Sequence, residues 1–499
     1  YHNKTHQGFA KEAAEKSIVL LQNNNNVLPL GDDVKHIAVI GELADKTLLG
    51  GYSPKNVDGI SIIEAFKDTK YVIDFVDVSV PDNTALEQID SKFLMTKTGK
   101  EGVLAEYYNN TNFSGKPALT QIEKTIANYW HNLSPAPGIS SDNFSVRWTG
   151  YIVPEITGTY DFGLIGDDHL KFYLDDKLLL NNSEDNTKAK WSTCKITLKQ
   201  GEKYAIKVEH IEYDDIASAS LFWKINSDSN TNSEAIYKDA VTSAKKADVA
   251  ILVLGEKEEN GEGKDKTSLE LNAFSKILLN EITQTETPVI LILQNGRPLI
   301  LSEASKKVDG ILETWYAGEF SGQATVDIIT GKINPSGRLP ISFPENLGQL
   351  PIYYNQKRSS NSTYMDGSNK PLFAFGHGLS YSAFEYSNLG IEKPTLSKSE
   401  NQTVTVSIKN TSNLEGTEVV QLYITDLFSS VGTPKMQLRG FKRVDLKPNE
   451  TKTISFTLVP DDLSLWNRDM KRVVESGAFK VMIGAASNDI ILEATFNVE

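Results

Sequence analysis

Short, unbroken apolar segments alternate with helix-like segments in two separate stretches of the chain, and this pattern restricts its fold more than any other feature. In the first stretch, helical spacing of apolar residues predicts a helix over 8–22 and another around 61–67, and the apolar runs 37–41 (IAVIG) and 71–76 (YVIDFV) follow them. Such runs are typical of strands buried on both faces of a parallel sheet. The order of elements therefore predicts β-α-β units.

The same pattern returns after residue 233. A helix is expected over 234–247 before the apolar run 249–255 (VAILVLG), and another over 268–283 before the run 288–293 (PVILIL). A weaker strand is expected at 310–314 (GILET). Strands that alternate with helices imply right-handed crossovers and a mostly parallel sheet.

The stretch between these two halves has a different period. From 102 to 224 apolar and polar residues alternate, aromatic residues are frequent, and Gly and Asp interrupt the runs. A period of two indicates half-buried antiparallel strands. We therefore expect one discontinuous α/β sandwich domain, 1–95 and 230–357, interrupted by an all-β sandwich or barrel at 96–229.

The last part of the chain is again all-β. After a connecting arm at 358–384, strand-like segments separated by turn residues run through 385–499. Roughly seven strands in about 115 residues are typical of a β-sandwich. The expected fold class is thus multidomain, with an α/β sandwich, an inserted β-domain and a C-terminal β-sandwich.

Charge and composition exclude several classes of function. The chain of 499 residues has 51 Lys and Arg against 65 Asp and Glu, a net charge of −14, which disfavours binding to nucleic acid. No segment approaches the roughly 18 uninterrupted apolar residues of a membrane helix. The single cysteine, Cys194, permits no internal disulfide and no Cys-rich metal site.

The segment 255–271 (GEKEENGEGKDKTSLEL) is the most polar part of the α/β domain and directly follows an expected buried strand. Ligands of open α/β sheets bind at the carboxyl ends of strands, and glycines flank Glu262 on both sides, so this glutamate is a candidate general acid. The alternative is a solvated acidic loop. Glycoside hydrolysis needs two carboxyl groups, and the sequence alone does not place a second one opposite Glu262.

Three other motifs have a structural and a functional interpretation. The run 166–169 (GDDH) suits either a β-turn closed by Asp side chains or a ligand pair for a hard cation. His377, between two glycines, is expected to be structural. Arg338 is expected either to pair with a carboxylate or to lie on the surface.

Several motifs, in order, resemble those of glycoside hydrolase family 3. The resemblance to its second domain covers SIVLLQNNNNVLPL, IAVIGELAD, GGYSP, WYAGEFSGQA, NPSGRLPISFP and FAFGHGLSYSAFEY. In the insert, GVLAEYY, FSVRWTG and DDHLKFYLDDKLLL resemble a protective-antigen-type carbohydrate-associated domain. EGTEVVQLYITD and LRGFKRVDLKPNET resemble the family's fibronectin type III-like domain.

The resemblance implies a retaining, exo-acting glycosidase, most often a β-glucosidase, with xylosidases and arabinosidases as close relatives. Its substrate would be an oligosaccharide or an aryl or alkyl glycoside, and no cofactor or metal is expected. The family's acid/base glutamate lies on a sandwich loop, which implies Glu262, with Glu259 as the fallback. Here the loop continues with Lys264, Asp265 and Lys266, and Asp265 is a candidate for substrate binding.

The family's nucleophilic aspartate lies on a TIM barrel that precedes the sandwich. The sequence shows no eight β/α repeats, and it begins at Tyr1 without a signal peptide. We therefore expect the barrel in a missing N-terminal region or in a separate chain, and an inactive fragment without it. A periplasmic or secreted location follows only from kinship.

A second hypothesis is a non-catalytic protein that binds carbohydrate through the inserted β-domain. Trp148 and Tyr173 are the candidates for stacking on sugar rings, although alternating aromatics more often belong to a core. Sugar binding without rescue of hydrolysis by a barrel would support this hypothesis.

Overall fold

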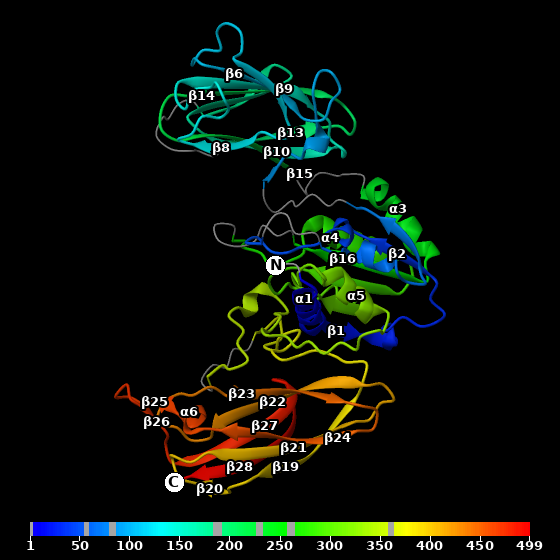
Figure 1. The fold of residues 1–499 in the computed structure, drawn as a ribbon, viewed down its shortest axis with the longest axis vertical. Helices are drawn as coiled ribbons and strands as arrows, with labels where there is room; N and C mark the ends of the chain where they lie inside the picture. The colour runs from blue at the N-terminus through cyan, green and yellow to red at the C-terminus, as the bar shows by residue number, and fades with distance from the viewer. Residues whose placement is uncertain are drawn as a thin grey trace. The chain divides into compact units, whose positions relative to one another are not determined.

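The computed structural model describes residues 3–53, 59–78, 86–182, 192–225, 233–256, 265–357 and 364–499. The chain divides into two compact units, the first made of 1–79, 237–271 and 278–499, and the second of 80–236 with 272–277. The first unit contains the α/β part and the C-terminal β-sandwich, and the second contains the inserted strands (Figure 1).

The α/β part is built on one sheet that is mostly parallel, as the apolar runs predict, with one antiparallel edge strand. Strands β3, β2, β16, β17 and β18 run parallel to one another, while the edge strand β1 is antiparallel to β18. The order across the sheet is β1 (Val19–Asn23), β18 (Gly310–Glu313), β17 (Val289–Gln294), β16 (Val249–Gly255), β2 (His36–Ile40) and β3 (Val72–Val76).

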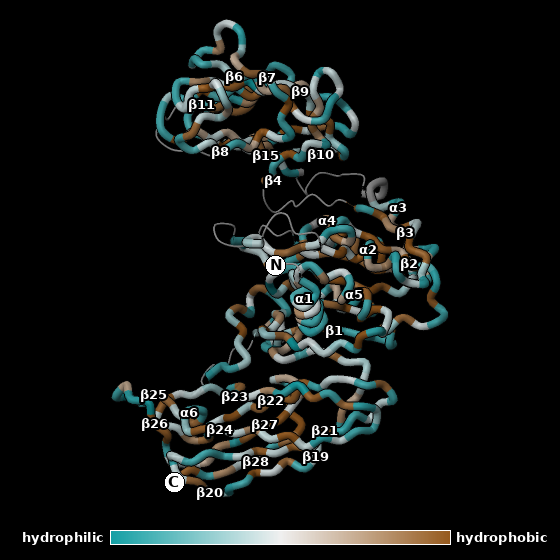
Figure 2. Tube along the Cα trace, viewed as in Figure 1, coloured by the Kyte–Doolittle hydropathy of each residue, from teal (hydrophilic) through white to brown (hydrophobic). Residues whose placement is uncertain are grey.

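Helices cover this sheet. Alternate residues of the central strands pack with α1 (Lys4–Ser17), α2 (Ile62–Phe66) and α5 (Ser321–Ile329) in one hydrophobic core. The intervening strand residues are buried too, as are apolar residues of α3 (Ser233–Lys246) and α4 (Ala273–Thr283). Figure 2 shows the hydrophobic segments gathered at the sheet with hydrophilic loops around them. Burial on both faces explains why the central strands β2, β16, β17 and β18 are continuous apolar runs, whereas the edge strand β3 is partly exposed.

The second unit consists of two antiparallel sheets. One contains β4 (Glu87–Gln88), β8 (Ala127–His131), β10 (Gly158–Asp167), β13 (Ser192–Leu198) and β15 (Ala217–Ile225). The other contains β5 (Leu94–Met95), β6 (Val103–Tyr108), β7 (Leu119–Glu123), β9 (Phe144–Ile152), β11 (His169–Leu174), β12 (Lys177–Asn181) and β14 (Tyr204–Glu212). The alternating burial along β9, β10 and β14 is the period of two that the sequence displays.

The C-terminal sandwich has its own core, formed by the inner faces of two sheets. One sheet is β19 (Phe384–Ile391), β21 (Gln402–Asn410) and β24 (Thr451–Leu458). The other is β20 (Thr395–Leu396), β28 (Asp489–Val498), β27 (Gly477–Ala486), β22 (Gly416–Asp426) and β23 (Gln437–Leu446). The short helix α6 (Pro460–Leu463) precedes a hairpin of β25 (Leu465–Trp466) and β26 (Arg472–Val473).

Two predicted boundaries are wrong. The helix expected over 8–22 ends at Ser17, and Val19–Asn23 is a strand, because Val19 and Leu20 pair with β18 at the sheet edge. The inserted β-domain begins before residue 96, since β4 and β5 already pair with β15 and β9. Two-residue strands are too short to display an alternating pattern.

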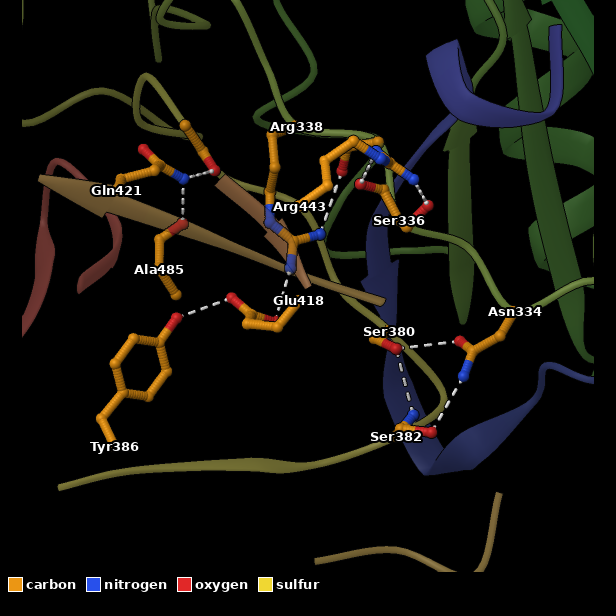
Figure 3. Close-up of polar contacts among 12 residues, drawn as sticks. Asn334, Ser336, Arg338, Ser380, Ser382, Tyr386, Glu418, Gln421, Arg443 and Ala485 are labelled. Atoms are coloured by element: carbon orange, nitrogen blue, oxygen red, sulfur yellow. Dashed lines mark hydrogen bonds and ion pairs between the residues drawn. The ribbon is translucent and has the colours of Figure 1, made fainter. Parts of the chain in front are cut away.

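A polar network with a buried centre at Arg338 and Glu418 joins the α/β part to the C-terminal sandwich (Figure 3). The guanidinium of Arg338 donates to Glu418 Oε2 at 3.0 Å, and Tyr386 donates its hydroxyl to Glu418 Oε1 at 2.7 Å. On the same side, Arg443 donates to the hydroxyl of Ser336 at 2.7 Å. The run 334–344 thus contacts the C-terminal sandwich through Ser336 and Arg338. Arg338 pairs with a carboxylate, which is one of its two predicted roles.

Candidate functional site

The carboxyl ends of the parallel strands β2, β16, β17 and β18 lie at one edge of the α/β sheet, where open sheets bind ligands. At the end of β16, Gly255 has a φ of 151°, and a Cβ there would lie 1.9 Å from the carbonyl oxygen of Gln294. Only glycine fits this close approach. The Glu256 backbone nitrogen still donates to the Gln294 carbonyl oxygen at 2.9 Å, so the chain stays paired with β17 up to Glu256.

Glu256, the next residue, is held by an arginine from the neighbouring strand end. Arg297 Nε donates to Glu256 Oε2 at 2.9 Å, and a terminal nitrogen of Arg297 donates to Glu256 Oε1 at 2.7 Å. The Glu256 side chain is only 7% exposed. A buried, bidentate pair of this kind is strong and geometrically specific. Glu256 therefore anchors the end of β16 to Arg297.

The same contacts bring together the two sides of the acidic segment. A terminal nitrogen of Arg297 also donates to the carbonyl oxygen of Ser268 at 2.7 Å, and Lys266 Nζ lies 3.3 Å from Glu256 Oε1. Tyr316 donates its hydroxyl to the carbonyl oxygen of Glu256 at 3.1 Å. Residues 256 and 266–268 are thus fixed side by side.

The two glutamates predicted to act as acid/base, Glu262 and Glu259, lie outside the described residues. Asp265, the predicted substrate-binding residue, is the first described residue after 264, and it is exposed. These three assignments stay predictions.

A second carboxyl group at this edge was missed from the sequence. Glu313 is the last residue of β18 and is fully buried. It accepts hydrogen bonds from Asn295 Nδ2 at 3.2 Å and from the Trp315 backbone nitrogen at 3.0 Å. Burial, aided by the nearby Glu256 carboxylate, raises the pKa of Glu313 to about 8. Glu313 is therefore protonated at neutral pH. A charged residue closing the apolar run GILET was the available signal.

In the all-β unit, Trp148 cannot meet a sugar. Its side chain is 0% exposed, its indole nitrogen donates to Glu123 at 2.7 Å, and its ring stacks on Trp130 with centroids 6.3 Å apart. The prediction that Trp148 contacts substrate is wrong, because its side chain lies on the face of β9 that points into the core. Tyr173 is partly exposed, and Lys207 Nζ lies 3.9 Å from its ring centroid, so its role in binding stays a prediction.

The other motifs of this unit show structural contacts. Asp168 lies between β10 and β11 and accepts a hydrogen bond from the Tyr213 backbone nitrogen at 2.8 Å, a contact to a distant loop that neither closes a turn at 166–169 nor tests the cation interpretation. Within the described ranges, no group of three or more His, Cys, Asp or Glu residues is arranged to hold a metal ion.

A buried acid and a buried base lie together on β14. His210 and Glu212 are fully buried, with His210 Nε2 3.5 Å from Glu212 Oε2. Burial lowers the pKa of His210 to about 3, and burial with the neighbouring aspartates raises the pKa of Glu212 to about 8. Both groups are therefore neutral near pH 7, so the pair places no charge in the core.

His377 has the structural role predicted for it. Its Nε2 lies 2.9 Å from the Leu21 carbonyl oxygen, and its ring stacks on Phe373.

Among the helices that the structure describes, none is long and apolar enough to cross a membrane.

Comparisons with known families agree with this architecture. Residues 18–381 match the Glycosyl hydrolase family 3 C-terminal domain, and residues 418–487 match the Fibronectin type III-like domain. The first match covers most of the α/β part and the strands inserted into it.

Individual relatives are glycosidases by name. The chain is 41% identical over 256 residues to a beta-xylosidase of Formosa agariphila, which covers 50% of this chain and 35% of that protein. It is 40% identical over 266 residues to the periplasmic beta-glucosidase of Salmonella typhimurium, 51% of this chain and 35% of that protein. The crystal structure of the Kluyveromyces marxianus beta-glucosidase with glucose matches all of this chain and 62% of its own, with 27% identity and a TM-score of 0.72. The chain therefore spans about a third of the two curated relatives.

Proposed function

The chain belongs to glycosyl hydrolase family 3, and from that membership we propose that it carries the general acid/base of a retaining, exo-acting glycosidase. The substrate is a β-glucoside or β-xyloside, cleaved from the non-reducing end of an oligosaccharide or from an aryl or alkyl aglycone. The names of the Formosa, Salmonella and Kluyveromyces relatives support these two sugars.

We assign the acid/base role to Glu262, with Glu259 as the fallback. The observation that carries this assignment is the clasp formed by Arg297, Glu256 and Ser268 at the carboxyl edge of the sheet. It fixes both flanks of the segment 257–264 that contains the two glutamates. A proton donor must return to the same position in every turnover, and anchored flanks favour that. Asp265, at the exposed end of the segment, is proposed to contact substrate.

The chemistry follows from two carboxyl groups. In a retaining mechanism, a nucleophilic carboxylate about 5–5.5 Å from the acid attacks the anomeric carbon while the acid protonates the departing oxygen. The same glutamate, now ionised, then removes a proton from the water that hydrolyses the glycosyl-enzyme. We place the nucleophile on a TIM-barrel domain, either in an upstream region of the same protein or in a separate chain. No cofactor takes part in these steps.

The inserted unit is proposed to be a protective-antigen-type domain, on its sequence resemblance. The alternative function, carbohydrate binding without catalysis through this unit, has lost one of its two candidate residues because Trp148 is buried. We propose a periplasmic or secreted location, supported by the name of the Salmonella relative.

Hydrolysis of aryl β-glucosides and aryl β-xylosides tests the proposal. We expect no turnover by the 499-residue chain alone and turnover after a family barrel is added in trans. In the complemented mixture, Glu262→Gln should lower kcat roughly 10²–10⁴-fold for a substrate whose leaving group needs protonation, while Glu259→Gln should leave it near wild type. Turnover by the chain alone that Glu262→Gln abolishes would contradict the external nucleophile. Loss in Glu259→Gln instead would move the role to the fallback residue.

A further inference from the structure

A groove of about 480 Å³ lies in the C-terminal sandwich, far along the chain from the acidic segment. Its walls come from the loop 431–434, the start of β23, and the segment 462–466 that joins α6 to β25. Figure 1 shows α6, β25 and β26 together at one end of this sandwich. Neither family match assigns a ligand to it.

The groove has a fixed floor and a rigid aromatic wall. Phe479 and Leu463, which line it, belong to the hydrophobic core of the sandwich. Trp466 also lines the groove and is 60% exposed. It lies on β25 opposite Arg472 of β26. Because core residues form the floor, the groove exists without a ligand, as most small-molecule sites do.

The hairpin that carries Trp466 is braced. Arg472 Nε donates to the hydroxyl of Ser464 at 2.8 Å, and a terminal nitrogen of Arg472 lies 2.7 Å from Asp461 Oδ2. These contacts are exposed and therefore weak, but the tryptophan ring has only two side-chain torsions, so it loses little conformational entropy on binding. An exposed tryptophan in such a position is suited to contact a ligand rather than to fill a core.

The groove also offers an unused donor. Within the described part of the chain, Arg439 Nε is buried and has no hydrogen-bond partner, although a terminal nitrogen of the same guanidinium donates to Gln437. Arg439 lines the groove. A buried donor without an acceptor is unfavourable, so a reorientation of the Arg439 guanidinium toward the groove, where its N–H groups could donate to a ligand hydroxyl, would be favoured.

The charges around the groove are nearly balanced. Lys357, Arg439 and Arg472 are opposed by the carboxylates of Asp426 and Asp462. A polyanion would meet the carboxylates, and an apolar helix would desolvate all five charged groups without pairing them. A neutral ligand with hydroxyl groups can donate to the carboxylates and accept from the cationic side chains. If it also has a flat apolar face, that face can stack on the Trp466 indole.

We propose that this groove binds a neutral glycan, with a pyranose ring stacked on Trp466 and its hydroxyls hydrogen-bonded to Arg439 and the flanking carboxylates. The site is independent of the proposed acid/base, because it uses none of the residues at the carboxyl edge of the α/β sheet. Its effect would be to hold the protein on a polymer whose chain ends are the substrate.

Native gel electrophoresis of the 499-residue chain tests the site without any hydrolysis. The gels contain hydroxyethylcellulose, arabinoxylan or barley β-glucan, and the association constant is obtained from the retardation at several polymer concentrations. We expect at least one polymer to retard the wild type, and Trp466→Ala to weaken that binding at least tenfold. Trp466→Phe should retain part of it.

Phe441→Ala is the matched control. Phe441 is 63% exposed on β23 of the same sandwich and does not line the groove, so its removal should leave retardation unchanged. Equal retardation of Trp466→Ala and wild type would place glycan binding elsewhere and overturn the proposal, as would the absence of retardation by all three polymers. Neither result bears on Glu262, which the hydrolysis assay tests separately.

Discussion

Glu313 is a carboxyl group whose protonation state affects the stability of the α/β part. Its pKa is raised from 4.5 to about 8 by burial, so the folded protein holds a proton that the unfolded chain releases. Below pH 4.5 both states are protonated and burial carries no ionisation penalty. As pH rises towards 8, this carboxyl therefore lowers the free energy of unfolding by about 1.4 kcal/mol per pH unit.

Glu313→Gln removes that dependence, because glutamine has the shape of the protonated acid and cannot ionise. Each Glu313 oxygen accepts a hydrogen bond and the glutamine amide nitrogen cannot accept one of them, so we expect the variant to melt below the wild type at pH 5. As pH rises to 8, its melting temperature should rise relative to that of the wild type. Thermal unfolding of both proteins across this range measures the difference. A difference in melting temperature that stays constant with pH would show that Glu313 is ionised in the folded protein.

Arg297 is expected to matter through its partner as much as through itself. Arg297→Met leaves the Glu256 carboxylate buried without its main partner, and breaking a buried pair in this way costs about 3–5 kcal/mol. The double variant Arg297→Met, Glu256→Met should be less destabilised than the single one, because no uncompensated charge remains. Urea denaturation gives both values. Additive losses would mean that the two side chains do not interact.

At the level of elements, strand cores were predictable and element ends were not. The runs IAVIG and VAILVLG became β2 and β16 because burial on both faces leaves no polar position within them. The segment SIVLLQ fits helical spacing equally well, and only pairing with β18, almost 300 residues further on, makes Val19–Asn23 a strand. Sequence periodicity is local and does not contain that information.

Some parts of the candidate site were also predictable from the sequence and others were not. The carboxyl edge and the acidic segment followed from the order of strands and the placement of glycines, while the partners Arg297 and Glu313 did not. Each lies at the end of a different strand, and only the sheet brings them next to Glu256. Trp148 and Tyr173 show the converse, since alternation along β9 and β11 does not reveal which face is inside.

Two glycines give opposite predictions for the same substitution. At Gly337, a Cβ would lie 2.2 Å from the carbonyl oxygen of Ile18, so Gly337→Ala must displace the backbone between α1 and β1 and should destabilise by about 2 kcal/mol or more. At Gly8, within α1, nothing lies within 4 Å, and Gly8→Ala should stabilise by about 0.5–1 kcal/mol. Denaturant titration of the two variants compares them directly. Equal effects would contradict this account.

At the level of the molecule, the network around Arg338 couples the α/β part to the C-terminal sandwich. Burial and the Glu418 carboxylate raise the pKa of Tyr386 above its usual value, so the phenol remains a hydrogen-bond donor. Arg338→Met leaves Glu418 with Tyr386 alone. We expect calorimetry to show the C-terminal sandwich unfolding earlier and in a separate transition. Arg472→Met is the control, because it removes an exposed ion pair with Asp461. We expect the α/β part and the C-terminal sandwich of this variant still to unfold in one transition. A single shifted transition in Arg338→Met would argue against coupling through this network.

The antiparallel pairing of β1 with β18 also has a consequence for biosynthesis. Val19 pairs with Glu313, so about 290 residues must leave the ribosome before the edge strand finds its neighbour. At typical synthesis rates of 5–20 residues per second this takes about 15–60 s. For that time the nascent α1–β3 segment exposes apolar surface that later becomes core, while the strands of the second unit can already pair among themselves. We therefore expect chaperone occupancy to be highest on ribosomes that have not yet translated β18.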